Sequence, residues 1–248
     1  MNLLERIKFN MLFDMKRTLH FFYENGGFTA ARCDGKPAWV AAENRMTSRE
    51  IIYCFNEFLR ASGNEKLPGV VSDHATAKIC ADFYAQKNET VIDKKTVAVF
   101  FSEAPVAACH EAVPPLANET ALIEKWTADF YTSALRIELA QEEKTQIAQG
   151  LVACKRFYML AVKNGVSKYS AMGLINEPAL KICRLNLIYT PYRGKGYGRH
   201  ITAHLINTVC ENGCIPMLYV YGYNSAALRA YRSMGLAEAG FLTEINFL

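Results

Sequence analysis

A short glycine-rich segment in the C-terminal half combines residue types that could bind an anion. Residues 193–198 read Arg-Gly-Lys-Gly-Tyr-Gly, between an apolar stretch and an amphipathic one. This pattern predicts a strand, a tight turn and a helix. Glycine allows positive φ and a close approach of the backbone to a ligand. Unpaired N–H groups and partial positive charge at the start of the helix would favour phosphate groups, with Arg193 and Lys195 adding charge.

Two other phosphate-binding patterns do not fit this segment. A dinucleotide site needs Gly-x-Gly-x-x-Gly in a parallel β-α-β unit, with an acidic residue about 20 positions later. Here the spacing is Gly-x-Gly-x-Gly, and Glu211 falls inside the predicted helix. A P-loop needs Gly-Lys followed by Ser or Thr, which the chain lacks. A tight connection without any ligand stays open as the alternative at this point.

The segment resembles the pyrophosphate-binding pattern of the GNAT (GCN5-related) N-acetyltransferase superfamily, Arg/Gln-x-x-Gly-x-Gly/Ala. Residues 224–236 resemble the second signature of that family, Asn-x-x-Ala-x-x-x-Tyr-x-x-x-Gly-Phe. The final Phe is replaced by Leu236, which also suits a buried apolar position. The two motifs have the family's spacing, with a predicted strand between them. The resemblance covers about residues 105–248, and the whole chain looks like bacterial two-part GNAT proteins with a divergent N-terminal half.

The resemblance implies acetyl-coenzyme A as cosubstrate and no metal. In the family this molecule lies in a V-shaped gap between two strands, here 181–189 and 215–221. The first strand would pair with the pantetheine arm, and the glycine-rich turn would hold the pyrophosphate. Asn224 would cap its helix and contact the cofactor or an ordered water. The implied cofactor-binding residues are Leu187, Ile188, Tyr189, Arg193, Gly194, Lys195, Gly196, Tyr197, Gly198 and Asn224.

Tyr231 is the candidate catalytic residue, because the matching Tyr of the family protonates the leaving thiolate. A phenol can donate a hydrogen bond at neutral pH, and a placed general acid contributes about 10²–10⁴-fold. Packing on its helix is the alternative role. No general base stands out, since Glu177 and Tyr189 both have structural interpretations. The expected reaction is direct transfer of an acetyl group to an amine, with a non-catalytic acyl-coenzyme-A-binding regulator as the alternative.

The remaining reactive residues indicate no further site. His200 and His204 are four positions apart on one predicted helix, but packing is the favoured interpretation. His110 follows Cys109, which is a weak pattern for thiol chemistry. The eight cysteines form no Cys-x-x-Cys pair, so we predict neither a zinc site nor a disulfide framework.

Charge and hydropathy constrain the partners and the location. The net charge of +4 is spread along the chain without a basic run, which disfavours nucleic acid and a tRNA-dependent transferase. The N-terminus lacks the pattern of a signal peptide, and no uncharged apolar run reaches the length of about 18 that a membrane span needs. We therefore expect a cytoplasmic protein with an amine-bearing acceptor and no membrane contact, and a homodimer stays open.

The elements that must position these residues alternate between helix and strand. In the N-terminal half we expect a helix that ends by the glycines at 26–27, then a hairpin of strands 28–33 and 38–42. Thr47 to Glu50 reads as a capping box that opens a helix. A second helix at 73–86 and a strand at 96–101 follow.

The C-terminal half begins after a proline-containing stretch at 102–116. We expect a short strand within 106–113 and a helix that Asn118 caps, and then the following elements: helix 141–154, strands 156–162, 167–175 and 181–189, helix 196–210, strand 215–221, helix 224–234 and a final strand to Phe247. Asn164-Gly165 predicts the hairpin turn between the first two of these strands.

The predicted fold class is α+β. Residues 105–248 would form a GNAT domain, a mixed and mostly antiparallel sheet flanked by helices, and residues 1–104 a smaller α/β domain before it. The N-terminal domain would cover the acceptor side or form a subunit contact, which the resemblance implies.

Overall fold

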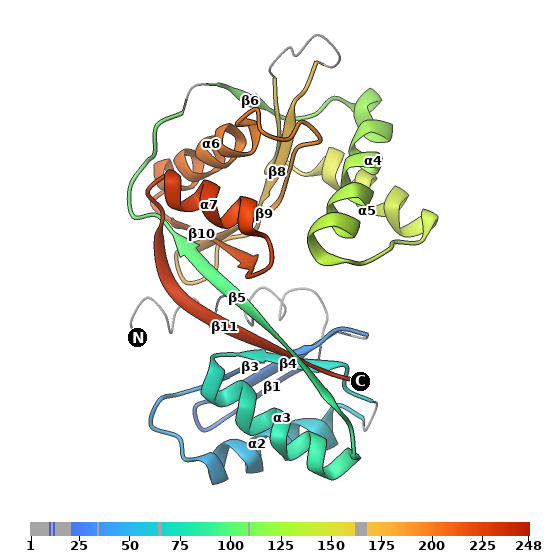
Figure 1. Ribbon diagram of the computed structural model, residues 1–248, viewed down its shortest axis with the longest axis vertical. Coiled ribbons are helices and arrows are strands. Elements are labelled where there is room, and N and C mark those ends of the chain that lie inside the picture. Colours follow the sequence, from blue (N-terminus) through green and yellow to red (C-terminus); the bar gives the residue numbers. More distant parts are fainter. Residues whose placement is uncertain are drawn as a thin grey trace. The chain divides into compact units, whose positions relative to one another are not determined.

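The computed structural model describes residues 10, 12, 21–33, 35–63, 66–108, 110–161 and 168–248. The chain folds into two compact units that are not consecutive in sequence (Figure 1). Unit 1 holds the described residues up to Val99 together with Tyr219–Tyr223 and Glu238–Leu248. Unit 2 holds Phe100–Leu218 and Asn224–Ala237. The division into domains at 104/105 stays a prediction, and the compact units add the two late segments to the N-terminal part.

Unit 1 is a sheet with two helices on one face. Its strands lie in the order β1-β2-β3-β4-β11-β5. The pairs β1/β2, β2/β3 and β4/β11 are antiparallel, and β3/β4 is parallel. Its elements are β1 (Phe21–Asn25), β2 (Phe28–Arg32), β3 (Ala38–Ala42), α2 (Ser48–Ala61), β4 (Gly69–Ser72), α3 (His74–Asn88), β5 (Ile92–Phe101) and β11 (Ala237–Phe247).

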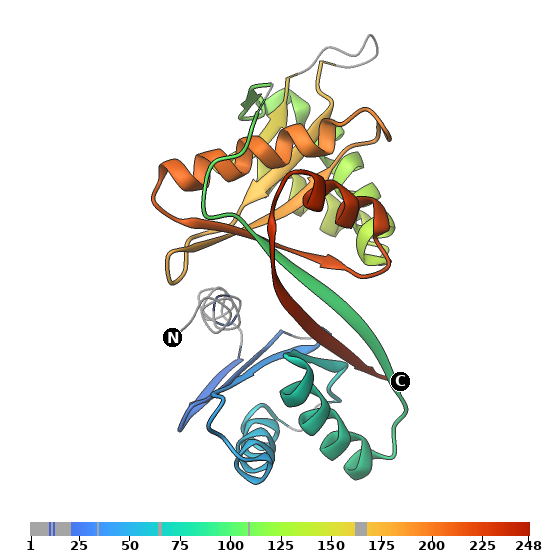
Figure 2. The ribbon, with the colours of Figure 1, turned by 60° about the vertical axis from the view of Figure 1, so that its left-hand side comes forward.

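The core of unit 1 follows from the two-residue period of its strands. Phe28 and Ala30 of β2 face α2 and α3, and together with Phe55 and Phe58 of α2 they form the main core cluster. Ala31 points to the opposite face. Figure 2 shows both helices on the same side of the sheet. The strand pattern thus determines which face the helices cover.

Unit 2 is a sheet with helices on both faces. Its strands lie in the order β10-β9-β8-β7-β6, with β9/β10 parallel and the other pairs antiparallel. Its elements are β6 (Ala112–Val113), α4 (Thr120–Phe130), the π-helical turn Tyr131–Leu135, α5 (Gln141–Ala153), β7 (Phe157–Leu160), β8 (Ala171–Ile175), β9 (Ile182–Tyr189), α6 (Tyr197–Glu211), β10 (Ile215–Tyr221) and α7 (Ser225–Ser233).

Neighbouring residues of β8 separate the two faces of this sheet. Ala171 packs with Ile201 of α6, whereas Met172 packs with Ile123 and Trp126 of α4. A Cβ at Gly173 would lie 2.6 Å from Leu205 Cδ1, so the absence of a side chain there lets α6 pack closely on the sheet. Figure 1 shows α6 on one side of β8, and α4 and α5 on the other.

The two units repeat one order of elements. Unit 1 runs β1-β2-β3-α2-β4-α3-β5, and the later part of the chain runs β7-β8-β9-α6-β10-α7-β11. In both runs the first three strands are antiparallel neighbours and the fourth is parallel to the third. The feature that the two runs share is the order and direction of their strands and helices.

Most of the predicted elements are confirmed, with differences mainly at their ends. The expected N-terminal helix lies largely outside the described residues, and its predicted end is wrong because Phe21–Asn25 is a strand. Asn118 does not cap α4, since it lies in a 3₁₀ turn, Ala117–Glu119, before the helix. The strand expected within 106–113 is only Ala112–Val113. The turn at Asn164-Gly165 lies outside the described residues.

Candidate functional site

The glycine-rich segment forms an open turn at the start of α6. Gly194 and Gly196 have φ of +74° and +79°, values that disfavour residues with a Cβ. Gly196 is the N-cap of α6, and no side chain accepts a hydrogen bond from the first helical N–H groups. A helix start without a side-chain cap leaves its donors available to another acceptor.

The backbone N–H groups of this turn lack protein acceptors. The first N–H groups that are bonded belong to Arg199 and His200, which both donate to the carbonyl oxygen of Gly196 at 2.9 and 3.2 Å. Within the described part of the chain, the N–H groups of residues 193–198 donate to no protein atom. Six consecutive free donors beside a helix N-terminus are the arrangement that binds phosphate.

Thr190 fixes the beginning of the turn. Its hydroxyl donates to the carbonyl oxygen of Ser170 at 2.6 Å and accepts from the N–H of Tyr192 at 3.1 Å. The Tyr192 ring also lies edge-on to Tyr197, with centroids 6.1 Å apart. Sequence reasoning did not single out Thr190, although a hydroxyl residue just after a strand is a common turn-forming signal.

The strand that precedes the turn separates from its parallel neighbour. β9 and β10 pair through three residue pairs, of which Arg184 and Met217 form the last, although β9 continues to Tyr189. Beyond Arg184, the described residues of β9 pair with none of β10. The edge of Leu185–Tyr189 can therefore pair with an extended ligand.

A β-bulge interrupts the same part of β9. Leu174 pairs with Asn186 and Met172 with Tyr189, so β9 has one extra residue there. Leu187 adopts a φ of +50°, and its N–H donates to its neighbour Asn186 Oδ1 at 2.8 Å. Bulges redirect the backbone and side chains and are common beside active sites. Of the three β9 residues predicted to contact the pantetheine arm, Leu187 thus has its N–H already engaged.

Tyr231 and Asn224 lie on α7 as the second motif predicts. The Asn224 side chain accepts from Ala227 N at 3.2 Å, which confirms it as the helix cap. Tyr231 is buried with 8% of its surface exposed, and its ring lies 5.8 Å from that of Phe100. Burial raises the pKa of its phenol, so the hydroxyl keeps its proton at neutral pH. Leu236 is buried, as expected for the position that departs from the motif.

Tyr189, at the end of β9, connects the turn to α4. Its hydroxyl donates to Asp129 Oδ2 at 3.3 Å, and its ring centre lies 6.0 Å from the Arg193 guanidinium. Burial, and then the nearby Asp129 carboxylate, raise the pKa of Tyr189 to about 12. A phenol with that pKa is a poor base at neutral pH. Asp129 was not identified from the sequence, since an acidic residue on an amphipathic helix is common.

The other sequence candidates have structural partners. Glu177 Oε1 lies 2.6 Å from Arg156 Nη2, so an ion pair engages this carboxylate. The His200 ring packs edge-on against His110 with centroids 4.5 Å apart, and His204 packs against Tyr158. Burial lowers the pKa of both His200 and His204. Cys109 lies outside the described residues.

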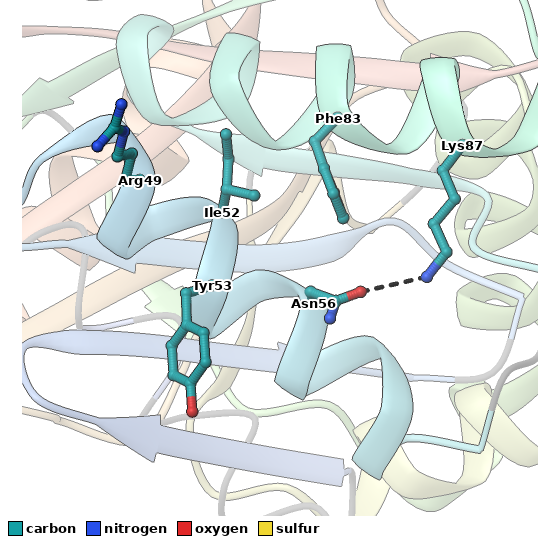
Figure 3. A pocket seen from close by; sticks show the side chains of 6 residues that line it. All are labelled: Arg49, Ile52, Tyr53, Asn56, Phe83 and Lys87. Carbon is teal, nitrogen blue, oxygen red and sulfur yellow. Dashed lines mark hydrogen bonds between the residues drawn. The ribbon is translucent and has the colours of Figure 1, made fainter.

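A pocket of about 490 Å³ lies elsewhere, on the outer surface of unit 1. It contains none of the predicted site residues, and Lys87 Nζ donates to Asn56 Oδ1 across it at 3.1 Å (Figure 3). Residues of α2 and α3 line it: Arg49, Ile52, Tyr53, Asn56, Phe83 and Lys87.

The described residues contain neither a metal-binding cluster nor a membrane-spanning helix. No group of three or more His, Cys, Asp or Glu side chains there could hold a metal ion. None of the helices in those ranges has the length and apolar character to cross a membrane.

Comparison with known proteins identifies the fold around this turn. Residues 123–236 match the model of the Acetyltransferase (GNAT) family. A GCN5-related N-acetyltransferase from Kribbella flavida is similar in structure, with a TM-score of 0.67 and 15% identity over 100% of this chain and 96% of that one. A putative GNAT acetyltransferase from Novosphingobium aromaticivorans gives 0.59 and 16% over 100% of both chains. No curated protein matches the sequence.

These structural likenesses show the fold, which is the predicted α+β GNAT fold. An acetyltransferase of the GNAT family from Colwellia psychrerythraea is a third example, with a TM-score of 0.61 and 13% identity over 92% of this chain and 85% of that one. The matched residues 123–236 include α4, the bulged strand β9, the glycine turn and α7. The first part of unit 2, including β6, lies before the match.

Proposed function

Residues 123–236 form a GNAT acetyltransferase domain, and on that premise we propose that the protein moves an acetyl group from acetyl-coenzyme A to an amine by direct attack. The observation that carries the proposal is the set of unbonded N–H groups at residues 193–198. None of residues 193–198 is buried, so an acceptor from solution can reach these donors. We keep a cytoplasmic setting as part of the proposal.

The residues present fit a diphosphate and an extended arm. Gly194 and Gly196 hold the turn open, and Arg193 and Lys195 supply positive charge that complements a diphosphate. The free edge of Leu185–Tyr189 suits the amide groups of a pantetheine arm. In this proposal Ile188 and Tyr189 supply the main-chain groups, since the N–H of Leu187 is bonded to Asn186.

The proposed reaction forms one N–C bond and breaks one C–S bond. A protonated amine and the acetyl thioester give an amide, a free thiol and one proton, so no oxidant, metal or covalent enzyme intermediate is required. Tyr231 would give its proton to the departing sulfur and recover one from solvent or from the attacking nitrogen. Its raised pKa means that the phenol is present in the donating form over the neutral range.

Positioning rather than a strong base would supply most of the rate. Glu177 is paired with Arg156, and Tyr189 is protonated at neutral pH, so neither suits the role of base. Holding the amine and the thioester in the correct geometry can supply a large part of the barrier reduction. The second candidate, a non-catalytic acyl-coenzyme-A-binding regulator, would bind by the same turn and is favoured by the lack of an evident base.

Binding and turnover separate these two functions. Acetyl-coenzyme A at about 100 times its Kd should stabilise the protein by about 2.7 kcal/mol, measured as a higher melting temperature. No stabilisation at millimolar concentration would refute the proposed site. Free thiol release in the presence of an amine panel then reports transfer. Stabilisation without thiol release from any amine would favour the regulator.

A further inference from the structure

The pocket of unit 1 is a groove between its two helices. Successive turns of α2 form one side of it, and the C-terminal end of α3 forms the other (Figure 3). Its volume of about 490 Å³ lies within the range of small-molecule sites, which is about 300–1,000 Å³. The chemistry of its lining therefore indicates what kind of ligand it could take.

The middle of the groove is apolar and aromatic. Ile52 and Phe83 are half-buried, and the Phe83 ring packs edge-on against Phe55 of the core, with centroids 6.4 Å apart. Core packing thus holds this ring in place while one part of it faces the groove. Tyr53 has 62% of its surface exposed, which is unusual for a large ring in a helix. Covering these surfaces with an apolar ligand would remove them from water, which favours binding.

The positive charges of the two helices are compensated everywhere except in this groove. α2 and α3 carry four basic side chains in all. Arg60 and Lys78 each form an ion pair within their own helix. Arg49 and Lys87 form no ion pair with a described residue, and Lys87 Nζ donates to the neutral amide of Asn56 at 3.1 Å. The two cations without a counter-charge are therefore the two that line the pocket.

The acidic side chains of the same helices are engaged elsewhere. Glu57 and Asp82 belong to the two ion pairs, and Glu50 accepts a hydrogen bond from the N–H of Thr47 in the capping box. No acidic residue is among the described residues that line the pocket. A ligand that complements this lining must supply the negative charge itself.

The two cations lie at opposite ends of the groove. Arg49 is on the first turn of α2, and Lys87 bonds to Asn56, seven residues later on the same helix. That separation is a rise of about 10 Å along α2. Figure 3 shows the Ile52 and Phe83 side chains between these ends. We propose that the groove binds an elongated small molecule with an apolar, preferably aromatic, middle and an acidic group at each end.

A series of three ligands tests the proposed charge pattern on the full chain. The first is 1,4-phenylenediacetate, a benzene ring with a carboxymethyl group at each end. The second, 4-methylphenylacetate, has one carboxylate, and the third, 1,4-benzenediethanol, is neutral. Isothermal titration calorimetry should show affinity falling about fivefold at each step, the upper range for an exposed ion pair. The advantage of the dianion should also shrink at high salt, because exposed charges are screened.

Variants of the four basic residues separate the groove from the general charge of unit 1. Arg49→Gln and Lys87→Gln should each weaken binding of 1,4-phenylenediacetate about fivefold. Arg60→Gln and Lys78→Gln make the same charge change on the same two helices and should leave the affinity unchanged. An equal loss in all four variants would mean that the dianion responds only to net charge, which would overturn the inference.

Other outcomes would also overturn it. These are no binding of the dianion at millimolar concentration, or equal binding of the dianion and the neutral diol. An acidic amphipathic peptide, titrated in the same way, tests a protein partner as the occupant. Binding of the peptide without binding of 1,4-phenylenediacetate would assign the groove to such a partner instead of a small molecule.

The groove and the proposed acetyl-coenzyme A site can fail independently. None of the residues proposed to bind acetyl-coenzyme A lines this pocket. Arg49→Gln should therefore leave the stabilisation by acetyl-coenzyme A unchanged, and Gly196→Asp should leave the affinity for 1,4-phenylenediacetate unchanged. A protein that binds only one of the two ligands would support one proposal and refute the other.

Discussion

The starts of helices α2 and α6 occupy corresponding positions in the repeated element order, yet their chemistry is opposite. α2 begins with a complete capping box, in which Thr47 N–H donates to Glu50 Oε2 at 2.7 Å and Thr47 Oγ1 accepts from Glu50 N at 3.3 Å. α6 begins at Gly196 with no side-chain cap. A carboxylate therefore already lies at the first helix start, and an anion from outside can bind only at the second.

The parallel strand pairs beside these helices, β3/β4 in unit 1 and β9/β10 in unit 2, also differ. In unit 1 the hydroxyl of Ser72 on β4 donates to the carbonyl oxygen of Val40 on β3 at 2.7 Å, which ties the parallel pair together near its end. In unit 2 the parallel pairing of β9 with β10 stops at Arg184, and a bulge follows. Both parallel pairs therefore stop before the first strand ends, at Trp39 and Val71 in unit 1 and at Arg184 and Met217 in unit 2, but in unit 1 the Ser72 hydroxyl bridges the two strands just beyond the last pair.

The helices that follow the parallel pairs complete the contrast. Both have a side-chain cap, from Asp73 in α3 and Asn224 in α7. Seven residues after the cap, α7 has Tyr231 and α3 has the fully buried Cys80. Burial raises the pKa of that thiol, so it is inert. The two units thus share an element order but differ in the side chains at corresponding positions, and the proposed chemistry of unit 2 depends on those differences.

Gly196→Asp should have the largest effect on cofactor binding, because it places a carboxylate at the uncapped start of α6. We expect acetyl-coenzyme A to bind about 10³-fold more weakly, which corresponds to the loss of three charge-assisted hydrogen bonds of about 1.5 kcal/mol each. Isothermal titration calorimetry measures this change. Gly213→Asp is the matched control, since Gly213 also has positive φ, +67°, with open space around it. Equal affinity in both variants would remove the turn from the site.

Tyr231→Phe tests the contrast between α7 and α3. It should lower kcat by about 10²-fold, the lower end for a placed general acid, with little change in cofactor affinity. Cys80→Ala is the counterpart in unit 1 and should cost about 1 kcal/mol of stability while leaving kcat unchanged. Thiol release and thermal unfolding measure the two effects. A Tyr231→Phe protein with normal kcat would restrict this side chain to packing.

Much of this contrast was predictable from the sequence, because it depends on local signals. The capping box at Thr47, the cap at Asn224 and the open glycine turn each depend on a few adjacent residues, and the structure has all three. The strands and helices of both units follow from hydrophobic period and turn residues. The roles of Tyr231 and of the cofactor-binding residues stay predictions.

Features that need distant residues were not predictable. The bulge in β9 depends on its register with β8, and the bond from Tyr189 to Asp129 joins residues 60 positions apart. The assignment of Tyr219–Tyr223 and Glu238–Leu248 to unit 1 has no local signal at all. Local patterns determine how a segment folds, whereas pairing between segments is set by packing.

Thr47→Ala tests the capped start of α2 in unit 1. Loss of the cap should cost about 1 kcal/mol, or about 2–4 °C in melting temperature, without any gain of cofactor binding in unit 1. Hydrogen bonds from Thr47 lower the pKa of Glu50 below its ordinary value of 4.5. The stabilisation from Glu50 is therefore present above pH 4.5 and is lost as the pH falls through its lowered pKa. The effect of Thr47→Ala should shrink in that acidic range, while Ser48→Ala should be nearly neutral throughout.

His200→Gln should give the smallest effect, because it removes only a titratable charge near the uncapped start of α6. A methyl group at Gly196 would lie 3.7 Å from His200 Nε2, so this ring is close to the proposed diphosphate site. Burial, then His110 and Arg199, lower the pKa of His200 below 6.5 in the free protein. A bound anion favours the protonated ring, so affinity should rise as the pH falls through the bound-state pKa, by about threefold for a charge about 6 Å away in a high dielectric.

The measurement is the ratio of cofactor affinities of the native protein and His200→Gln between pH 5.5 and 7.5. Using the ratio cancels the titration of the cofactor's own phosphate, whose second pKa is about 6. His204→Gln, one turn later on α6 and packed against Tyr158, should leave the pH profile of the native protein unchanged. If His200→Gln and His204→Gln both keep the pH profile of the native protein, the anion does not approach this end of α6. The contrast between the two helix starts would then lack a functional consequence.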